Sequence, residues 1–317
     1  MTKQQGAITL QWTLISMTTQ EYLNTILKQQ SLSDDSDEIK ALRLERDMVE
    51  KLLRDSLEKS KPNIQYAGSY KKGTMIKDSY DLDIVCFFNH DDTEAGETLQ
   101  EIYNNVKKVL GSNYHVVLKR SALQLQNKDP LKFGVYFHID VVPGRFTDDK
   151  REDAFLYQSS GEKKYLKTNL QKHIKHIKNS GLRDIIKLIK FWKVRNGLDI
   201  KTFVLELLVI KILKKTKNED YAKILIKFWQ ELKDNVDEIH TEDPANPQGN
   251  DLSSFFNETV KNRLTAISAN TLILVEQNQW REIFGEIEKM SDLEKIVAVQ
   301  TIIKQNPKPV KPWCETE

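Results

Sequence analysis

Residues 81–88 decide the fold, and they read Asp81-Leu82-Asp83-Ile84-Val85-Cys86-Phe87-Phe88. The apolar run that ends this stretch is typical of a strand buried at the centre of a sheet. Residues two apart on a strand project to the same side, so the carboxylates of Asp81 and Asp83 would share one space. Because two such charges repel each other, the pair becomes favourable when divalent cations lie between them. The alternative is a structural pair that caps a turn.

A third acidic residue lies in a second apolar segment. Residues 131–142 alternate apolar and polar side chains as in a strand, which we expect to stop at Pro143-Gly144. Asp140 is on the polar face, where an acid buried without partners would cost on the order of several kcal/mol. We therefore infer that Asp140 is the third ligand of a metal site. His138 shares this face, and we interpret it as a neighbour of Asp140 and not as a catalytic base.

A glycine-serine pair precedes the acidic strand. Gly68-Ser69 follows a short strand expected at residues 64–67, and eleven residues separate the pair from Asp81. Glycine lets backbone N–H groups approach a phosphate closely, and the serine hydroxyl adds a donor. We therefore interpret the pair as a turn that holds the β- and γ-phosphates of a nucleotide. Such dipeptides are also common in ordinary turns.

The remaining pattern predicts an α+β chain in two lobes. Before residue 180 we expect an amphipathic helix over residues 38–59, a helix over 98–110 and a strand over 114–118. After about residue 181 the pattern is helical almost throughout, and the expected helices cover residues 182–194, 202–213, 221–232, 252–277 and 280–304. We therefore expect a catalytic lobe over residues 1–180, with its long N-terminal helix, and a helical lobe over residues 181–317.

The composition is that of a globular enzyme, with 39% hydrophobic and 30% charged residues. A net charge of only +2 argues against a surface built wholly to bind nucleic acid. The two cysteines, Cys86 and Cys314, support neither a disulfide framework nor a cysteine zinc site, and we interpret Cys86 as a core residue. No apolar segment resembles a membrane span or a signal peptide, so we expect a cytoplasmic protein that does not contact a membrane.

The basic residues are unevenly distributed along the chain. Between Lys163 and Arg195 there are nine lysines and two arginines but one acid, Asp184. These side chains could line a cleft for an anionic ligand, or they could form solvated helix faces. His173 and His176 lie three residues apart in this stretch, and we interpret both as surface residues because no third metal ligand is visible.

The glycine-serine pair and the three acids together resemble the polymerase-β-type nucleotidyltransferase superfamily, whose core is a mixed sheet that carries three carboxylates. Residues 243–250 read Asp-Pro-Ala-Asn-Pro-Gln-Gly-Asn and are similar to the Asp-Pro-x-x-Pro-x-x-Asn segment of oligoadenylate-synthase-like enzymes. With the long helix before Gly68, the resemblance points to the cGAS/DncV-like nucleotidyltransferases (CD-NTases) of bacterial anti-phage (CBASS) systems. It covers most of residues 38–250.

This resemblance implies an α+β fold with a polymerase-β-like core packed against a C-terminal helical lobe. Such enzymes make cyclic oligonucleotide second messengers from nucleoside triphosphates, and the product binds a separate effector protein. Lys190 matches a lysine that contacts the donor triphosphate. Thr202 matches a hydroxyl residue that contacts phosphate, and Phe203 matches an aromatic residue that stacks on the base. The alternative for Phe203 is ordinary helix core.

The implied chemistry is phosphoryl transfer with two metal ions, Mg²⁺ or alternatively Mn²⁺. Asp81 and Asp83 would hold the triphosphate-bound ion and share the second ion, which Asp140 would complete. A nucleotidyltransferase that acts on an RNA end, a protein or a drug is one alternative, and a catalytically inactive nucleotide-binding scaffold is another. The chain lacks the cysteine-histidine zinc insertion of the animal DNA sensor, so a nucleic-acid activator is not indicated.

Overall fold

The computed structural model describes residues 17–128, 139–214, 216, 219–250 and 252–287. The described residues up to Gly285 belong to one compact unit. All of the helices and strands described below lie in this unit. The predicted division of the chain at residue 180 stays a prediction.

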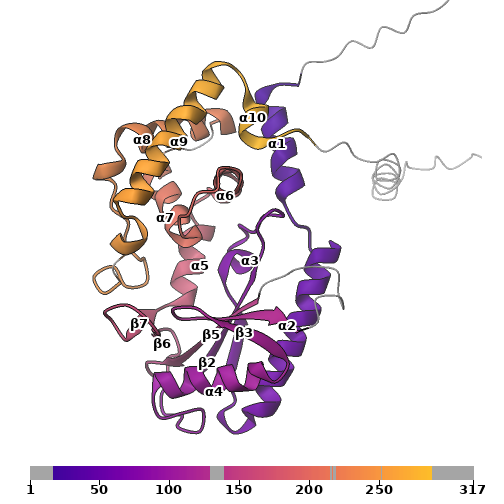
Figure 1. Cartoon of the computed structure of the whole chain (residues 1–317), viewed down its shortest axis with the longest axis vertical. Coiled ribbons are helices and arrows are strands. Elements are labelled where there is room, and N and C mark those ends of the chain that lie inside the picture. Colours follow the sequence, from indigo (N-terminus) through magenta and orange to yellow (C-terminus); the bar gives the residue numbers. More distant parts are fainter. Residues whose placement is uncertain (1–16, 129–138, 215, 217–218, 251, 288–317) are drawn as a thin grey trace, which may run out of the picture. The chain divides into compact units, whose positions relative to one another are not determined.

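The centre of the fold is a mixed sheet of seven strands in the described residues: β1 (Asn63–Tyr66), β2 (Leu82–Phe88), β3 (Tyr114–Leu118), β4 (Leu123–Asn127), β5 (Ile139–Phe146), β6 (Ala154–Tyr157) and β7 (Tyr165–Thr168). The order across the sheet is β1-β2-β5-β4-β3, and β6 pairs with both β5 and β7. β2 and β5 run parallel, whereas the other paired strands are antiparallel. The predicted mixed sheet is therefore present (Figure 1).

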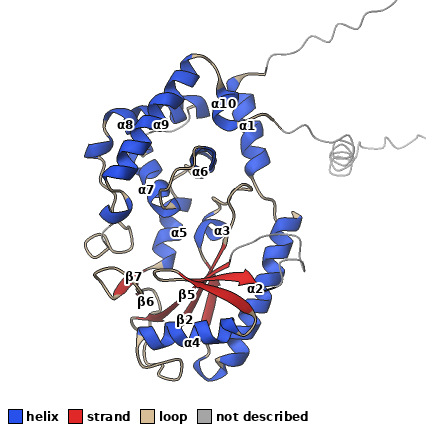
Figure 2. Cartoon of the chain, viewed as in Figure 1, coloured by secondary structure: helices blue, strands red, loops and turns tan. Residues whose placement is uncertain are grey.

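Helices make up most of the rest of the described chain (Figure 2). The α-helices are α1 (Thr19–Gln30), α2 (Asp37–Ser56), α3 (Gly68–Lys72), α4 (Leu99–Gly111), α5 (Leu170–Lys178), α6 (Arg183–Arg195), α7 (Thr202–Leu213), α8 (Tyr221–Asp234), α9 (Glu258–Glu276) and α10 (Trp280–Phe284). Short 3₁₀ helices occur at Glu58–Ser60, Val236–Glu238 and Ser253–Phe255. No helix in the described ranges combines the length and the apolar character that a membrane span requires.

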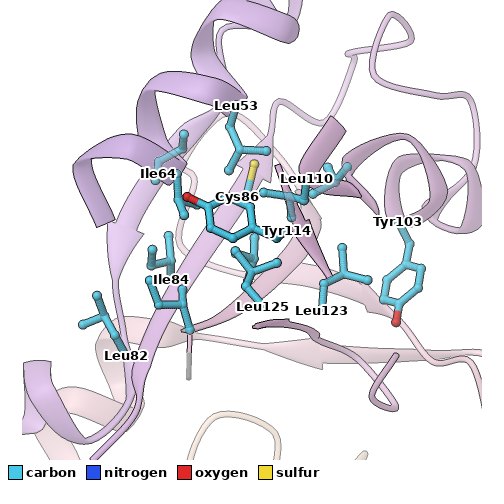
Figure 3. Close-up of a cluster of buried hydrophobic side chains, with 14 of the residues drawn as sticks. Leu53, Ile64, Leu82, Ile84, Cys86, Tyr103, Leu110, Tyr114, Leu123 and Leu125 are labelled. Carbon is cyan, nitrogen blue, oxygen red and sulfur yellow. The ribbon is translucent and has the colours of Figure 1, made fainter. Parts of the chain in front are cut away.

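Strand β2 is buried on both faces, as its apolar run predicts. Ile84 and Cys86 belong to a core that includes Leu53 of α2 and Leu110 of α4 (Figure 3). Their neighbour Val85 belongs to a second cluster that forms on the opposite face. Because side chains alternate along a strand, the carboxylates of the acidic pair project on the face of Val85, away from α2 and α4.

Helix α1 was not expected from the sequence. Thr18 and Glu21 form a capping box at its start, in which each side chain accepts a hydrogen bond from the backbone N–H of the other residue. Leu23 and Ile26 are buried where α1 packs against α6 and α8. The Thr-x-x-Glu pattern was the available signal in the sequence.

The expected end of the 131–142 strand at Pro143-Gly144 is wrong, because β5 continues through both residues to Phe146. Its pairing with β4 ends at Val141, and its pairing with β6 begins at Gly144. Pro143 lies between these two pairings, where a missing N–H breaks no ladder on that edge. Residues 131–138, including His138, lie outside the described residues.

Two of the expected helices are shorter than predicted. The helix expected over 252–277 begins only at Glu258, where the Asn257 side chain accepts from the Val260 backbone N–H. The helix expected over 280–304 ends at Phe284, followed by Gly285 at a φ of 88°. Residues 288–304 of that prediction lie outside the described residues.

Candidate active site

Three carboxylates meet at one end of the parallel strand pair. Asp81 directly precedes β2, Asp83 is the second residue of β2, and Asp140 is the second residue of β5. The parallel register places Asp83 opposite Asp140. One ligand oxygen from each of the three side chains lies within 4.8 Å of the others. The structure therefore brings together all three acids that the sequence suggested as metal ligands.

Burial and neighbouring negative charge disfavour the ionisation of Asp81 and Asp83. Burial, followed by the charges of Asp81 and Asp140, raises the pKa of Asp83 to about 7. Burial and then Asp140 also raise the pKa of Asp81, against the opposing charges of Lys190 and Lys119. Negative charge is thus concentrated in a partly buried space.

A divalent cation fits this arrangement. Asp140 Oδ2 accepts from Lys119 Nζ at 2.6 Å, while its Oδ1 is buried with no hydrogen-bond partner among the described residues. A buried acceptor without a donor is unfavourable, and a cation would satisfy it. Hard carboxylate oxygens are the ligands that Mg²⁺ and Mn²⁺ prefer. Asp81, Asp83 and Asp140 could therefore hold metal ions.

Gly68 lies directly against Asp83. The pair expected as a turn instead begins the short helix α3, and Gly68 has a φ of 55°. A Cβ at this position would lie 1.5 Å from Asp83 Oδ2, so only glycine leaves room for the carboxylate. The Ser69 hydroxyl is buried with no hydrogen-bond partner in the described part of the chain. Gly68 is therefore in direct contact with one of the acids, and the predicted phosphate contacts of Gly68 and Ser69 stay a prediction.

Lys190 is a buried lysine whose charge acts on Asp81. Its side chain is on α6, the residue is 4% exposed, and Nζ donates to the Thr74 carbonyl at 2.8 Å. Burial lowers the pKa of Lys190, while the charges of Glu206 and Asp81 oppose that shift. The amine therefore acts electrostatically on Asp81. Its predicted contact with a triphosphate stays a prediction.

A buried ion pair next to this lysine was missed from the sequence. Lys72 Nζ at the end of α3 lies 2.7 Å from Glu206 Oε2 on α7, and Thr74 Oγ1 donates to Glu206 Oε1 at 2.7 Å. Glu206 is buried within the apolar run of α7, and that lone acid was the available signal. The pair joins the segment after Gly68 to the helical part of the chain.

Thr202 and Phe203 are the first two residues of α7, and each lies next to a lysine side chain. Thr202 Oγ1 accepts from Lys193 Nζ at 3.3 Å. Phe203 is partly exposed, with Lys72 Nζ 5.0 Å from its ring centroid. Lys193 was not singled out from the sequence. Burial lowers its pKa, and the charges of Asp199 and Asp81 partly oppose that shift. Lys193 therefore joins the candidate residues around the acids.

The structure differs from the sequence interpretation at His173. Its Nε2 lies 2.6 Å from Asp243 Oδ1, its side chain is 16% exposed, and its ring lies 4.8 Å from that of Phe203. Asn250 Nδ2 donates to the other Asp243 oxygen at 2.6 Å. Asp243 and Asn250, the first and last residues of the 243–250 segment, thus hold His173 beside Phe203. His176 is exposed, as predicted.

Comparison with known families gives this geometry its context. Residues 17–180, more than half of the chain, match the sequence model of the SMODS family, the Second Messenger Oligonucleotide or Dinucleotide Synthetase domain. The chain belongs to this family. The SMODS match confirms the predicted resemblance to cGAS/DncV-like nucleotidyltransferases and the predicted enzyme class. A comparison with curated protein sequences gives no match.

Solved structures share the SMODS chain's fold at low sequence identity. E. coli MS115-1 CdnC, in its complex with HORMA-deltaN, matches with a TM-score of 0.64 and 16% identity over 85% of this chain and 97% of that chain. The Bradyrhizobium diazoefficiens CD-NTase CdnG with GTP matches with a TM-score of 0.61 and 14% identity over 90% of this chain and 98% of that chain. Vibrio cholerae DncV cyclic AMP-GMP synthase with a linear intermediate matches with a TM-score of 0.59 and 17% identity over 86% of this chain and 81% of that chain. These matches confirm the predicted polymerase-β-like fold.

Proposed function

We propose that this member of the SMODS family joins nucleoside triphosphates into a cyclic oligonucleotide that serves as a second messenger in anti-phage defence. The observation that supports this most directly is the convergence of Asp81, Asp83 and Asp140 beside Gly68. In each step a ribose hydroxyl oxygen forms a bond to an α-phosphorus. The bond from that phosphorus to the bridging oxygen breaks, and pyrophosphate leaves with the electron pair.

Asp81, Asp83 and Asp140 would hold the metal ions, with Mg²⁺ the expected ion and Mn²⁺ the alternative. Divalent cations bound there would neutralise phosphate charge and lower the pKa of the attacking hydroxyl. The raised pKa values of Asp81 and Asp83 support this assignment, because acids that repel one another gain most from a cation. The unsatisfied oxygen of Asp140 supports it independently.

The donor triphosphate would lie between α3 and the start of α7. Gly68 and Ser69 would contact its phosphates, and the unpartnered buried hydroxyl of Ser69 is the supporting observation. Lys190 and Thr202 would add positive charge and a hydroxyl donor. Phe203 would stack on the base, which its partial exposure permits.

The proposed partners are nucleoside triphosphates and a separate effector protein for the product. GTP is present in the CdnG structure and a linear dinucleotide in the DncV structure, and both proteins share the fold of this chain. Transfer to an RNA end or to another acceptor, and a catalytically inactive scaffold, are the alternatives. The family match favours neither of them.

The test is product formation from triphosphates alone. We expect the full chain, given all four α-³²P-labelled triphosphates and Mg²⁺ or Mn²⁺, to form a product that resists phosphatase and is opened by nuclease. Asp81→Asn should abolish that product, whereas Asp35→Asn, at an exposed site between α1 and α2, should not. Label that enters only an added RNA or protein would instead support the acceptor-dependent alternative.

A further inference from the structure

A cavity lies between α5 and α7, and none of the three acids lines it. Its volume is about 560 Å³, which is within the usual range for small-molecule sites. Lys172, Lys175 and His176 of α5 line it, together with Lys214, which follows α7. None of the residues placed in the candidate active site lines this cavity. Figure 1 shows where α5 and α7 lie in the fold.

The ionisable side chains that line this cavity are all basic. The cavity lining includes no carboxylate, and within the described ranges none of Lys172, Lys175 and Lys214 makes an ion pair. Desolvation of its ring, and then the charges of His173 and Lys214, lower the pKa of His176. Lysines in the last turn of a helix can offset its dipole, but Lys172 lies in the first turn of α5. A bound anion would reduce the mutual repulsion of these groups.

The cavity also has an apolar part. Leu182 and Ile210 are buried side chains in its lining, and Pro244 completes that surface. An adjoining cavity of about 280 Å³ shares His176, Ile210 and Lys214 with it. The adjoining cavity also contains one carboxylate, Glu242, whereas the larger cavity has none. The larger cavity therefore offers an apolar surface beside several amines, which suits a ligand with a flat apolar part and more than one negative charge.

The cavity is separate from the candidate base-stacking position. Ile210 is seven residues beyond Phe203 on α7, which corresponds to about 10 Å along the helix axis. Asp243, the neighbour of Pro244, holds His173 against the Phe203 ring.

We propose that this cavity is a second nucleotide site, which binds a nucleoside triphosphate with its base on Leu182, Ile210 and Pro244. The phosphates would contact Lys172, Lys175 and Lys214 without a metal ion, because the lining supplies amines and no carboxylate. The proposal does not rest on the proposed reaction, since it concerns binding at residues that take no part in that reaction.

The experiment measures ATP binding under conditions that disable the acidic site. Full-length Asp83→Asn protein in EDTA is titrated with ATP by calorimetry, and the same protein carrying Lys175→Ala and Lys214→Ala is compared with it. We expect the double lysine substitution to weaken ATP binding at least tenfold. Lys178→Ala removes an α5 lysine that does not line the cavity, and it should change the affinity less than twofold.

Two further probes test the composition of the site. Inorganic tripolyphosphate should bind more weakly than ATP with the same dependence on the two lysines, and adenosine should bind weakest. Equal ATP affinity with and without the double lysine substitution would overturn the proposal. Single-stranded RNA that binds more tightly than ATP and depends on the same lysines would also overturn it, in favour of a nucleic-acid surface.

Discussion

Lys119 Nζ lies 2.6 Å from Asp140 Oδ2, so an amine is in contact with one of the two oxygens of a carboxylate that would hold the proposed metal ion. Lys119 follows β3, and its side chain is 40% exposed. The amine offsets the charge of the acids when no ion is bound. A cation that binds Asp140 through this oxygen must displace the amine.

Replacing Lys119 by alanine should therefore tighten metal binding. An ion pair this exposed contributes about 1 kcal/mol at most, so the expected gain in Mn²⁺ affinity is up to about fivefold. Calorimetry with Mn²⁺ and no nucleotide measures it, and Lys119→Arg, which keeps the charge, should change the affinity little. Unchanged metal affinity together with lost turnover would assign Lys119 to the substrate instead.

Gly68→Ala should displace the Asp83 carboxylate. A Cβ at residue 68 would overlap Asp83 Oδ2, and the φ of 55° adds backbone strain. We expect product formation to fall by at least about 100-fold, roughly 2.7 kcal/mol of barrier. Gly111→Ala is the matched control, because a Cβ there meets no atom within 4 Å. Near-normal activity of Gly68→Ala would show that the acid can move without loss.

The stability of the metal-free protein should depend on pH through Asp83. Its pKa is raised from 3.8 to about 7, so between these values the folded state binds more protons than the unfolded chain. The free energy of unfolding attributable to Asp83 therefore falls as pH rises through this interval. We expect the Tm advantage of Asp83→Asn over wild type in EDTA to be larger at about pH 8 than at about pH 5. An advantage that is constant with pH would contradict the raised pKa.

Glu206→Gln should destabilise the fold strongly, because it leaves Lys72 buried without its ion-pair partner and removes one of the two negative charges that act on Lys190. The expected loss is about 3 kcal/mol, measured by urea denaturation. Adding Lys72→Met should recover part of that loss, so the double variant loses less than the sum of the singles. Asp55→Asn, which breaks the exposed pair with Lys51, should cost under about 0.5 kcal/mol. Strict additivity of the Lys72 and Glu206 substitutions would argue against coupling.

Lys190→Met should raise the KM for triphosphate about tenfold with a smaller effect on kcat, if its amine contacts the donor in both ground and transition states. Initial rates at varied triphosphate concentration separate the two constants. Lys187→Met is the matched control, because Lys187 is on the same helix and donates a hydrogen bond to Ser31 Oγ. A fall in stability with an unchanged KM would show that Lys190 has only a structural role, through its hydrogen bond to the Thr74 carbonyl.

The features that were predicted correctly from the sequence depend on local periodicity. The spacing of Asp81 and Asp83 places both carboxylates on one side of β2, because side chains alternate along any strand. Helix α7 begins at Thr202 and ends at Leu213, as expected. These features depend on neighbours within a few residues, so the sequence determines them without knowledge of the fold.

Tertiary packing decides the features that could not be predicted. Asp140 meets Asp83 because β2 and β5 pair in parallel in one register, and a shift of one residue would turn its carboxylate to the other face. The pairing of Pro143 with Cys86 of β2, the Lys72–Glu206 pair and the His173–Asp243 contact likewise join residues far apart in sequence. The sequence alone specified the acids and their local geometry. Which distant side chain meets each acid was decided by the packing of the whole core, because that packing selects one register and one set of long-range contacts.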